Sequence, residues 1–168
     1  MSKEQNKDLL QFLSSYPEEK QQTALWLRDF IWDQYPHCNE LIWDNYNALA
    51  LGWSPTDKLG HIFCSVAVYR TNNNIHFGFY WGNEIADPEK KLIGNGKQYR
   101  YFPVTDINKF PKAYLKKLMK EAYANSLAKV KDKKLLRKEE TIVKSISDKK
   151  RTSKKSIIKK KSAKLKSK

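Results

Sequence analysis

Residues 94–97, with the sequence GNGK, have the composition of an anion-binding loop. Backbone N–H groups in a glycine turn can surround an anion, and a lysine can neutralise its charge. A nucleotide-binding P-loop needs four residues between its glycines and a Ser or Thr after its lysine. Here one residue separates the glycines and Gln98 follows Lys97, so the pattern favours a plain turn. Lys97 and Arg100 are candidates for a small anion or ligand pocket, although a regular strand would point them to opposite faces.

Two histidine–cysteine pairs have the residue types of a metal site. His61 and Cys64 are three residues apart, and His37 and Cys38 are adjacent. Structural zinc sites need four converging ligands, whereas His61 and Cys64 would project from opposite faces of one strand. Cys64 has apolar neighbours and is predicted to be a small buried side chain. Neither cysteine has an obvious base in the sequence, so no thiol nucleophile is predicted.

Acidic residues gather near the ends of the predicted strands, namely Glu40, Asp44, Glu84, Asp87 and Glu89. Two of them would act as general acid and base only with separated pKa values inside a cleft. The simpler interpretation is a solvated loop rim. The candidate metal ligands are Glu40, Asp44, Glu84 and Asp87. Because no nucleophile–base pair or metal constellation is recognisable, we expect no catalytic residues, no enzymatic activity and no cofactor.

Aromatic residues offer a further candidate site. The relevant set is Trp43, Tyr46, Trp53, Tyr80 and Trp81. Most should belong to the core, yet exposed aromatic side chains mark ligand clefts and interfaces. Trp26 and Trp32 lie off the main apolar stripe of their predicted helix, and Trp53 precedes a proline turn, so some indoles should be exposed. The candidate ligand pocket therefore comprises Trp43, Tyr46, Trp81, Lys97 and Arg100.

The strongest signal is the distribution of charge. Residues 129–168 hold 18 Lys or Arg against 4 Asp or Glu, whereas residues 1–128 hold 15 against 14. Lysines that neutralise nucleic-acid phosphates release condensed counterions, and a segment without aromatics cannot read bases. The segment therefore predicts sequence-independent nucleic-acid binding, by Lys149, Lys150, Arg151, Lys154, Lys155, Lys159, Lys160, Lys161, Lys164, Lys166 and Lys168.

Other interpretations of the basic segment stay open: a solubilising extension, adsorption to anionic lipid, or a contact for an acidic protein. Lipid is disfavoured because only Ile157 and Ile158 form an adjacent apolar pair beyond residue 148 and no aromatic anchor is present. No run approaches the roughly 18 apolar residues that cross a bilayer. Without an apolar N-terminal run, we expect two free thiols in a reducing cytoplasm, with nucleoid association as an alternative.

Hydrophobic periodicity predicts the elements that position these residues. Helices are expected at 6–14, after Pro17 and after Pro111, because apolar residues recur there every three or four positions. Strands are expected within 41–52, at 61–69, at 75–81 and at 97–104, with the second and third joined as a hairpin. This order predicts an α+β class, an antiparallel sheet with helices packed on one face. The domain is predicted at 1–128, and the Lys-rich segment at 129–168.

The basic segment itself contains a weak pattern. Apolar residues at 135, 136, 142, 143 and 146 indicate a basic helix at 133–148. Beyond residue 148 the composition is Lys/Ser low complexity. Such a segment cannot bury enough apolar surface to offset its ordering entropy, so we expect disorder there.

One pattern resembles a known family. Trp43 and Tyr46 precede a glycine turn, IHFGF occupies 75–79, and LIGNGKQYR at 92–100 fits L-x-G-x-G-K-x-x-R. Over about residues 8–127 the chain resembles the YdhG-like family, a domain of unknown function. The resemblance implies a compact α+β fold with helices against an antiparallel sheet. One branch is similar in architecture to frataxin and is regarded as an intracellular iron chaperone, so iron is the metal to consider. Such a role needs exposed carboxylates on one surface, and this chain has no dense acidic helix.

Two functions follow as hypotheses. The first is a non-enzymatic accessory protein, a YdhG-like domain attached to nucleic acid by its lysines. The second is an intracellular carrier of a small ligand or iron, to which the basic segment is incidental.

Overall fold

The computed structural model describes residues 6–136 and 138–152, and it has the predicted α+β class. The helices are α1 (Lys7–Leu13), α2 (Glu18–Gln34) and α3 (Lys112–Lys129). The strands are β1 (Asn39–Asp44), β2 (Ala48–Ser54), β3 (Cys64–Tyr69), β4 (Ile75–Phe79), β5 (Arg100–Pro103) and β6 (Thr141–Ile146). Short 3-10 turns are η1 (Leu59–His61), η2 (Gly82–Glu84), η3 (Ile107–Lys109) and η4 (Lys133–Leu135). None of the described helices is both long and apolar enough to cross a bilayer.

The helix boundaries follow local signals in the sequence. Asn6 caps α1 because its side-chain oxygen accepts a 3.0 Å hydrogen bond from the Leu9 amide. Pro17 precedes α2, where Glu18 and Glu19 lie at the positive end of the helix dipole. The helix ends before Pro36, whose ring would disrupt the hydrogen-bond ladder. The predicted helices at 6–14 and after Pro17 are confirmed.

The sheet is mixed rather than wholly antiparallel. Its strand order is β5-β4-β3-β2-β1-β6, and β6 pairs in parallel with β1 while the other described pairs are antiparallel. The predicted helix at 133–148 is wrong, because 141–146 form this strand. β-branched side chains at 141–143 suit a strand, and β1 offers an unpaired edge: the Glu40 amide donates to the Glu140 carbonyl at 2.8 Å. The sheet therefore extends well past residue 128.

The predicted strands also have different limits, and those expected at 75–81 and 97–104 span only 75–79 and 100–103. The apolar run at 41–52 is two strands, β1 and β2, joined by the turn at 45–47, where the Asn45 amide donates to the Ala48 carbonyl at 3.0 Å. The strand expected at 61–69 begins only at Cys64, because η1 occupies 59–61. The β3–β4 hairpin is confirmed.

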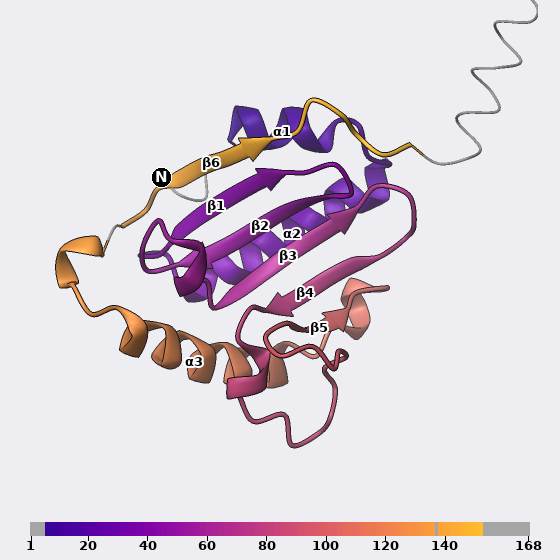
Figure 1. Ribbon diagram of the computed structural model, residues 1–168. Coiled ribbons are helices and arrows are strands. Elements are labelled where there is room, and N and C mark those ends of the chain that lie inside the picture. The colour runs from indigo at the N-terminus through magenta and orange to yellow at the C-terminus, as the bar shows by residue number, and fades with distance from the viewer. Residues whose placement is uncertain (1–5, 137, 153–168) are drawn as a thin grey trace, which may run out of the picture.

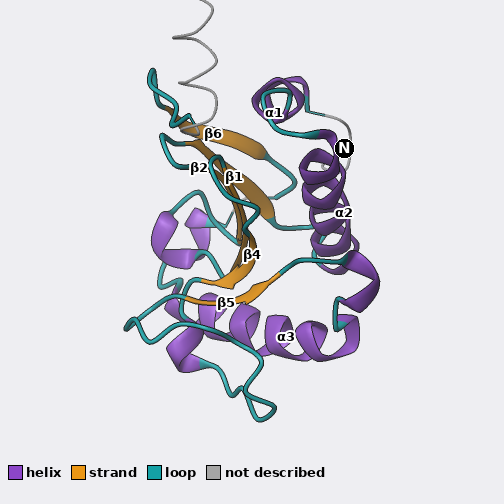
Figure 2. Cartoon of the chain, turned by 90° about the vertical axis from the view of Figure 1, so that its right-hand side faces the viewer, coloured by secondary structure: helices purple, strands orange, loops and turns teal. Residues whose placement is uncertain are grey.

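The helices cover one side and one end of the sheet (Figures 1 and 2). Figure 2 shows α1 and α2 along one side of the sheet and α3 at the end near β5. Side chains of α2, α3 and that side of the sheet share one core, which includes Leu27, Ile31, Phe77, Leu115 and Met119. No described helix other than the short η1 turn covers the opposite face, which is the side nearest the viewer in Figure 1.

The expected exposure of the indoles is wrong for Trp32 and Trp53. Both are fully buried, and their rings meet edge to face with centroids 6.1 Å apart. Trp32 comes from α2 and Trp53 from β2, so the pair fills the layer between helix and sheet. The apolar periodicity of α2 does not predict the burial of Trp32, because this side of the helix is covered by strands of the sheet and not by neighbouring residues in the sequence.

A buried ion pair and an adjoining hydrogen bond join the helical layer to β1 and to the edge strand β6. The Arg28 Nε lies 2.7 Å from Glu40 Oε2 and its Nη2 lies 3.1 Å from Oε1, and both side chains are almost inaccessible. Thr141 Oγ1 donates to Glu40 Oε1 at 3.2 Å. Arg28 lies on α2, Glu40 on β1 and Thr141 on β6, so the carboxylate accepts hydrogen bonds from both of its neighbours in the fold.

We predict that Arg28→Met lowers the free energy of unfolding by about 3–5 kcal/mol, because it leaves the Glu40 carboxylate buried without its cation. Urea denaturation would measure this loss. The double variant Arg28→Met/Glu40→Leu serves as the control and should recover much of it, since no charge is then stranded. A single-variant loss below about 1 kcal/mol would show that the pair is as weak as a surface ion pair.

Candidate functional site

The face of the sheet opposite α2 is hollowed because small side chains line its middle. One cross-strand row runs from Trp43 through Ala50 and Ala67 to His76. The next row places Gly52, Ser65 and Gly78 side by side on β2, β3 and β4. Adjacent strands lie about 4.8 Å apart, so Trp43 and His76 stand roughly 14 Å apart with only alanines between them.

Aromatic side chains form the walls of this hollow, which we call the aromatic trough. It has a volume of about 410 Å³. It is lined by Trp43, Asn45, Ala50, Leu51, Gly52, Leu59, Ile62, Ser65, Ala67, Tyr69, Tyr80 and Tyr99. No lining residue is charged, and the side chains of Trp43, Tyr69, Tyr80 and Tyr99 are each partly exposed. Clefts of this size, largely apolar with a few polar groups, are the usual sites for small ligands.

Glycines on the trough face are required by close packing. A Cβ on Gly78 would lie 2.3 Å from the Tyr99 hydroxyl oxygen and 2.4 Å from its ring, so the glycine lets Tyr99 lie against the sheet.

Gly94 has φ of +121°, a conformation that other residues rarely adopt, and it turns the chain before β5. Burial raises the pKa of Tyr99, and a hydrogen bond with Ser65 opposes this in part. Tyr99 is therefore a neutral wall residue at physiological pH.

His76 ends the cross-strand row that begins at Trp43 and is not one of the residues that line the trough. Its ring stacks on Tyr101 with centroids 3.7 Å apart and lies 4.8 Å from the Tyr69 ring. The side chain is 8% exposed, and its Nδ1 is buried without a hydrogen-bond partner among the described residues. Burial lowers the pKa of His76, so the imidazole is held in its neutral form.

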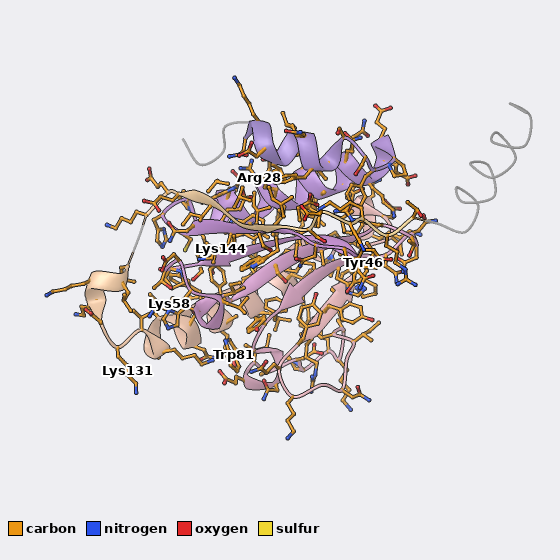
Figure 3. The ribbon with its side chains drawn as sticks, turned by 45° about the horizontal axis from the view of Figure 1, so that its top comes forward. Arg28, Tyr46, Lys58, Trp81, Lys131 and Lys144 are labelled. Carbon is orange, nitrogen blue, oxygen red and sulfur yellow. The ribbon has the colours of Figure 1, made fainter. Side chains whose placement is uncertain are left out.

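The five predicted pocket residues do not converge. Trp43 lines the trough, whereas Tyr46 lies exposed in the 45–47 turn, and Trp81 lies well apart from Tyr46 and does not line the trough (Figure 3). The Trp81 Nε1 donates to the Gly60 carbonyl at 2.9 Å, and the Lys129 ammonium lies 4.1 Å from its ring centroid. Trp81 therefore fastens η1 to the end of α3 rather than lining the trough.

Lys97 and Arg100 do not build an anion site together. The Arg100 guanidinium donates to the Gly96 and Tyr99 carbonyls, so it holds the 94–99 loop in place. Lys97 is exposed on that loop. The prediction of a plain turn at 94–97 is consistent with these contacts.

The candidate acidic residues are separated, and each has its own partners. Glu40 is bound by Arg28, Asp44 by Arg70 and Lys150, and Glu84 by Lys129 at 2.5 Å. Burial of Asp87 opposes ionisation, but the Tyr114 hydroxyl and the amides of Leu92 and Lys91 donate to it, and its pKa is lowered on balance. Among the described residues no group of three or more His, Cys, Asp or Glu side chains could hold a metal ion together.

The two thiols are free and buried, as predicted for Cys64. Burial raises the pKa of Cys64 well above its ordinary value and that of Cys38 to about 12. Both are therefore protonated and poor nucleophiles. His61 does not face Cys64 but forms a 2.7 Å hydrogen bond through Nδ1 with the Thr56 hydroxyl.

The basic segment leaves the sheet beside the trough. After β6, the Ser147 amide donates to the Asp44 carbonyl at 2.8 Å, and the Lys150 ammonium lies 2.7 Å from Asp44 Oδ2. The Arg151 amide donates to the Tyr46 carbonyl at 2.9 Å. Three of the basic residues predicted to bind nucleic acid are thus placed near the 45–47 turn, namely Lys149, Lys150 and Arg151. The others, from Lys154 to Lys168, lie outside the described residues.

No family model, curated protein or solved structure matches the chain. The trough was not predicted from the sequence, although the alternation of small and large residues in two strands indicates it. In ALALGW at 48–53 and SVAVY at 65–69, small residues alternate with large ones, which places all the small side chains on one face.

We predict that the protein loses stability as the pH falls below about 6.5, the ordinary pKa of histidine. A histidine whose folded pKa is lowered binds a proton more readily in the unfolded chain, so acid favours unfolding. Melting temperatures across pH 5 to 8 would measure the effect, and His76→Gln should flatten the curve. Burial and the neighbouring Lys58 and Lys129 also lower the pKa of His61, so His61→Gln is the matched comparison. Identical curves for the wild type and His76→Gln would contradict the assignment.

Proposed function

We propose that this protein is a non-enzymatic nucleic-acid-binding protein, a YdhG-like domain that holds the phosphate backbone through its lysine-rich C-terminal segment. The observation that carries the proposal is the charge of residues 129–168, with 18 basic and 4 acidic side chains. Duplex DNA carries one negative charge per about 1.7 Å of its axis, and neutralising those charges releases counterions. The segment has the charge density such a partner requires.

The placement of the described basic residues supports this proposal. Lys131, Lys133, Lys134, Lys138 and Lys149 are all exposed. Lys58, Lys131 and Lys144 lie toward one end of the molecule, away from Tyr46, where the chain leaves the domain (Figure 3). Cations are therefore available at both ends of the sheet, and the lysines beyond residue 153 come in addition.

The structure also determines how the proposal is best tested. A truncation at residue 128 would remove β6, so loss of binding by that variant could reflect loss of the fold. A full-length variant with the eight lysines of 154–168 changed to glutamine keeps the sheet and removes only charge. Lys117→Gln/Lys120→Gln is the matched control, because both of these exposed lysines lie on α3, outside the segment.

We predict that the wild type binds a mixed-sequence duplex with a steep salt dependence. Each neutralised phosphate contributes about −0.9 to the slope of log K against log salt, so six to eight contacts give roughly −5 to −7. The eight-glutamine variant should lose most of this slope and bind at least about 100-fold more weakly at moderate salt. Fluorescence anisotropy across a salt series measures both quantities. Equal slopes for the wild type and the eight-glutamine variant would refute the proposal, while the α3 control should change little.

A second candidate function is the carriage of a small apolar ligand, favoured by the aromatic trough. Such a ligand would bind only the folded state and raise the melting temperature, with a stabilisation that grows with the logarithm of its concentration above the Kd. The rise should disappear when the trough is filled by Ala67→Leu. The observations that suggest iron are weaker, since Glu40, Asp44, Glu84 and Asp87 each have separate partners.

A further inference from the structure

The trough is suited to a flat, uncharged ring. Its two sides are aromatic, its floor is formed by Ala50, Gly52 and Ala67, and none of its lining residues is charged. A ring inserted between such walls stacks on aromatic side chains without stranding a charge. The polar groups in reach are neutral, namely the Ser65 and tyrosine hydroxyls and the Asn45 amide. They can donate and accept hydrogen bonds at the edge of a heterocycle.

A phosphate, in contrast, would find no cation inside the trough. One basic group lies at its edge, where the chain crosses the 45–47 turn after β6. Arg151 Nη1 donates to Asn47 Oδ1 at 3.3 Å and the Arg151 amide donates to the Tyr46 carbonyl at 2.9 Å, whereas the Lys150 ammonium is paired with Asp44 on the side of the sheet near α1. Asn45, the first residue of that turn, lines the trough. Arg151 therefore lies at the turn that borders the trough.

A neutral stacking surface and an adjoining cation together fit one class of ligand. We propose that the trough receives an unpaired base of single-stranded nucleic acid, with Arg151 at the adjoining turn placed to pair with its phosphate. This inference rests on the proposed nucleic-acid binding and adds a base-binding site on the folded domain. Bases in a duplex are stacked and paired, so the trough reaches them only in single strands or at splayed ends.

The inference has a specific signature, a preference for single strands that depends on the trough while duplex binding does not. The test compares a mixed-sequence single-stranded DNA with the duplex of the same sequence, both fluorescently labelled, by anisotropy with full-length protein. Trp43→Leu removes one wall, and Ala67→Leu fills the floor without removing any aromatic ring. Tyr46→Ala is the matched control, because Tyr46 is exposed at the same turn but does not line the trough.

Trp43→Leu and Ala67→Leu should each weaken single-strand binding roughly five- to 100-fold, the loss expected for one stacked base. Their duplex affinity and the single-strand affinity of Tyr46→Ala should remain as in the wild type. One variant enlarges the trough and the other fills it, so the same loss of binding in both would not be explained by a single packing defect. Unchanged melting temperatures would show that both variants fold. Unchanged single-strand binding by both variants would overturn the inference.

Failure of this inference is distinguishable from failure of the proposed function. The eight-glutamine variant should weaken binding to single strand and duplex alike; if it weakens neither, nucleic-acid binding by the segment is wrong. If it weakens both while the trough variants bind as the wild type does, only the base site is wrong. Adenosine supplies a further arm: binding as tight as that of the strand would identify a free-ligand site and overturn the inference. If adenosine bound only to the variant Ile157→Ser/Ile158→Ser, the inference would also be overturned. That result would mean that these two isoleucines occupy the trough in the wild type.

Discussion

The buried Glu40 carboxylate is the constraint on which the arrangement of the layers depends. A charge removed from water is tolerated only when partners of good geometry surround it. Here the partners are Arg28 from α2 and Thr141 from β6, with donor–acceptor distances of 2.7 to 3.2 Å. The helix, the first strand and the last strand must therefore occupy their places together. Because β6 is fixed beside β1, the position at which the basic segment leaves the fold is also fixed.

The two faces of the sheet have opposite character for a steric reason. Large side chains such as Leu49, Leu51 and Phe77 point toward α2 and α3 and form the core. The positions between them are glycine, alanine and serine, which leave room above the sheet. That room is bounded by aromatic rings and is free of charge. One alternation of size thus produces both a tightly packed core and a hollow on the other side.

The net positive charge is concentrated in residues 129–168 and is almost absent from residues 1–128. The first 128 residues are nearly balanced, with 15 basic and 14 acidic side chains, so the core has little net repulsion to overcome. The excess of lysine lies in a segment that contributes one strand, and Asp44, which also pairs with Arg70, offsets part of that segment's charge by pairing with Lys150. This paired carboxylate marks the boundary between the packed domain and the cationic segment.

The α+β class, the helices after Asn6, Pro17 and Pro111, the β3–β4 hairpin and the burial of Cys64 could all be predicted from the amino-acid sequence. These features follow from local periodicity, capping and proline geometry, which act over a few residues. The strand at 141–146 depends instead on long-range pairing, because the free edge of β1 supplies hydrogen bonds that a local pattern cannot reveal. The tertiary structure likewise buried Trp32 against Trp53 and separated Trp43 from Tyr46, Trp81, Lys97 and Arg100. Strand register, a long-range property, set Trp43 across two alanines from His76 and so created the trough.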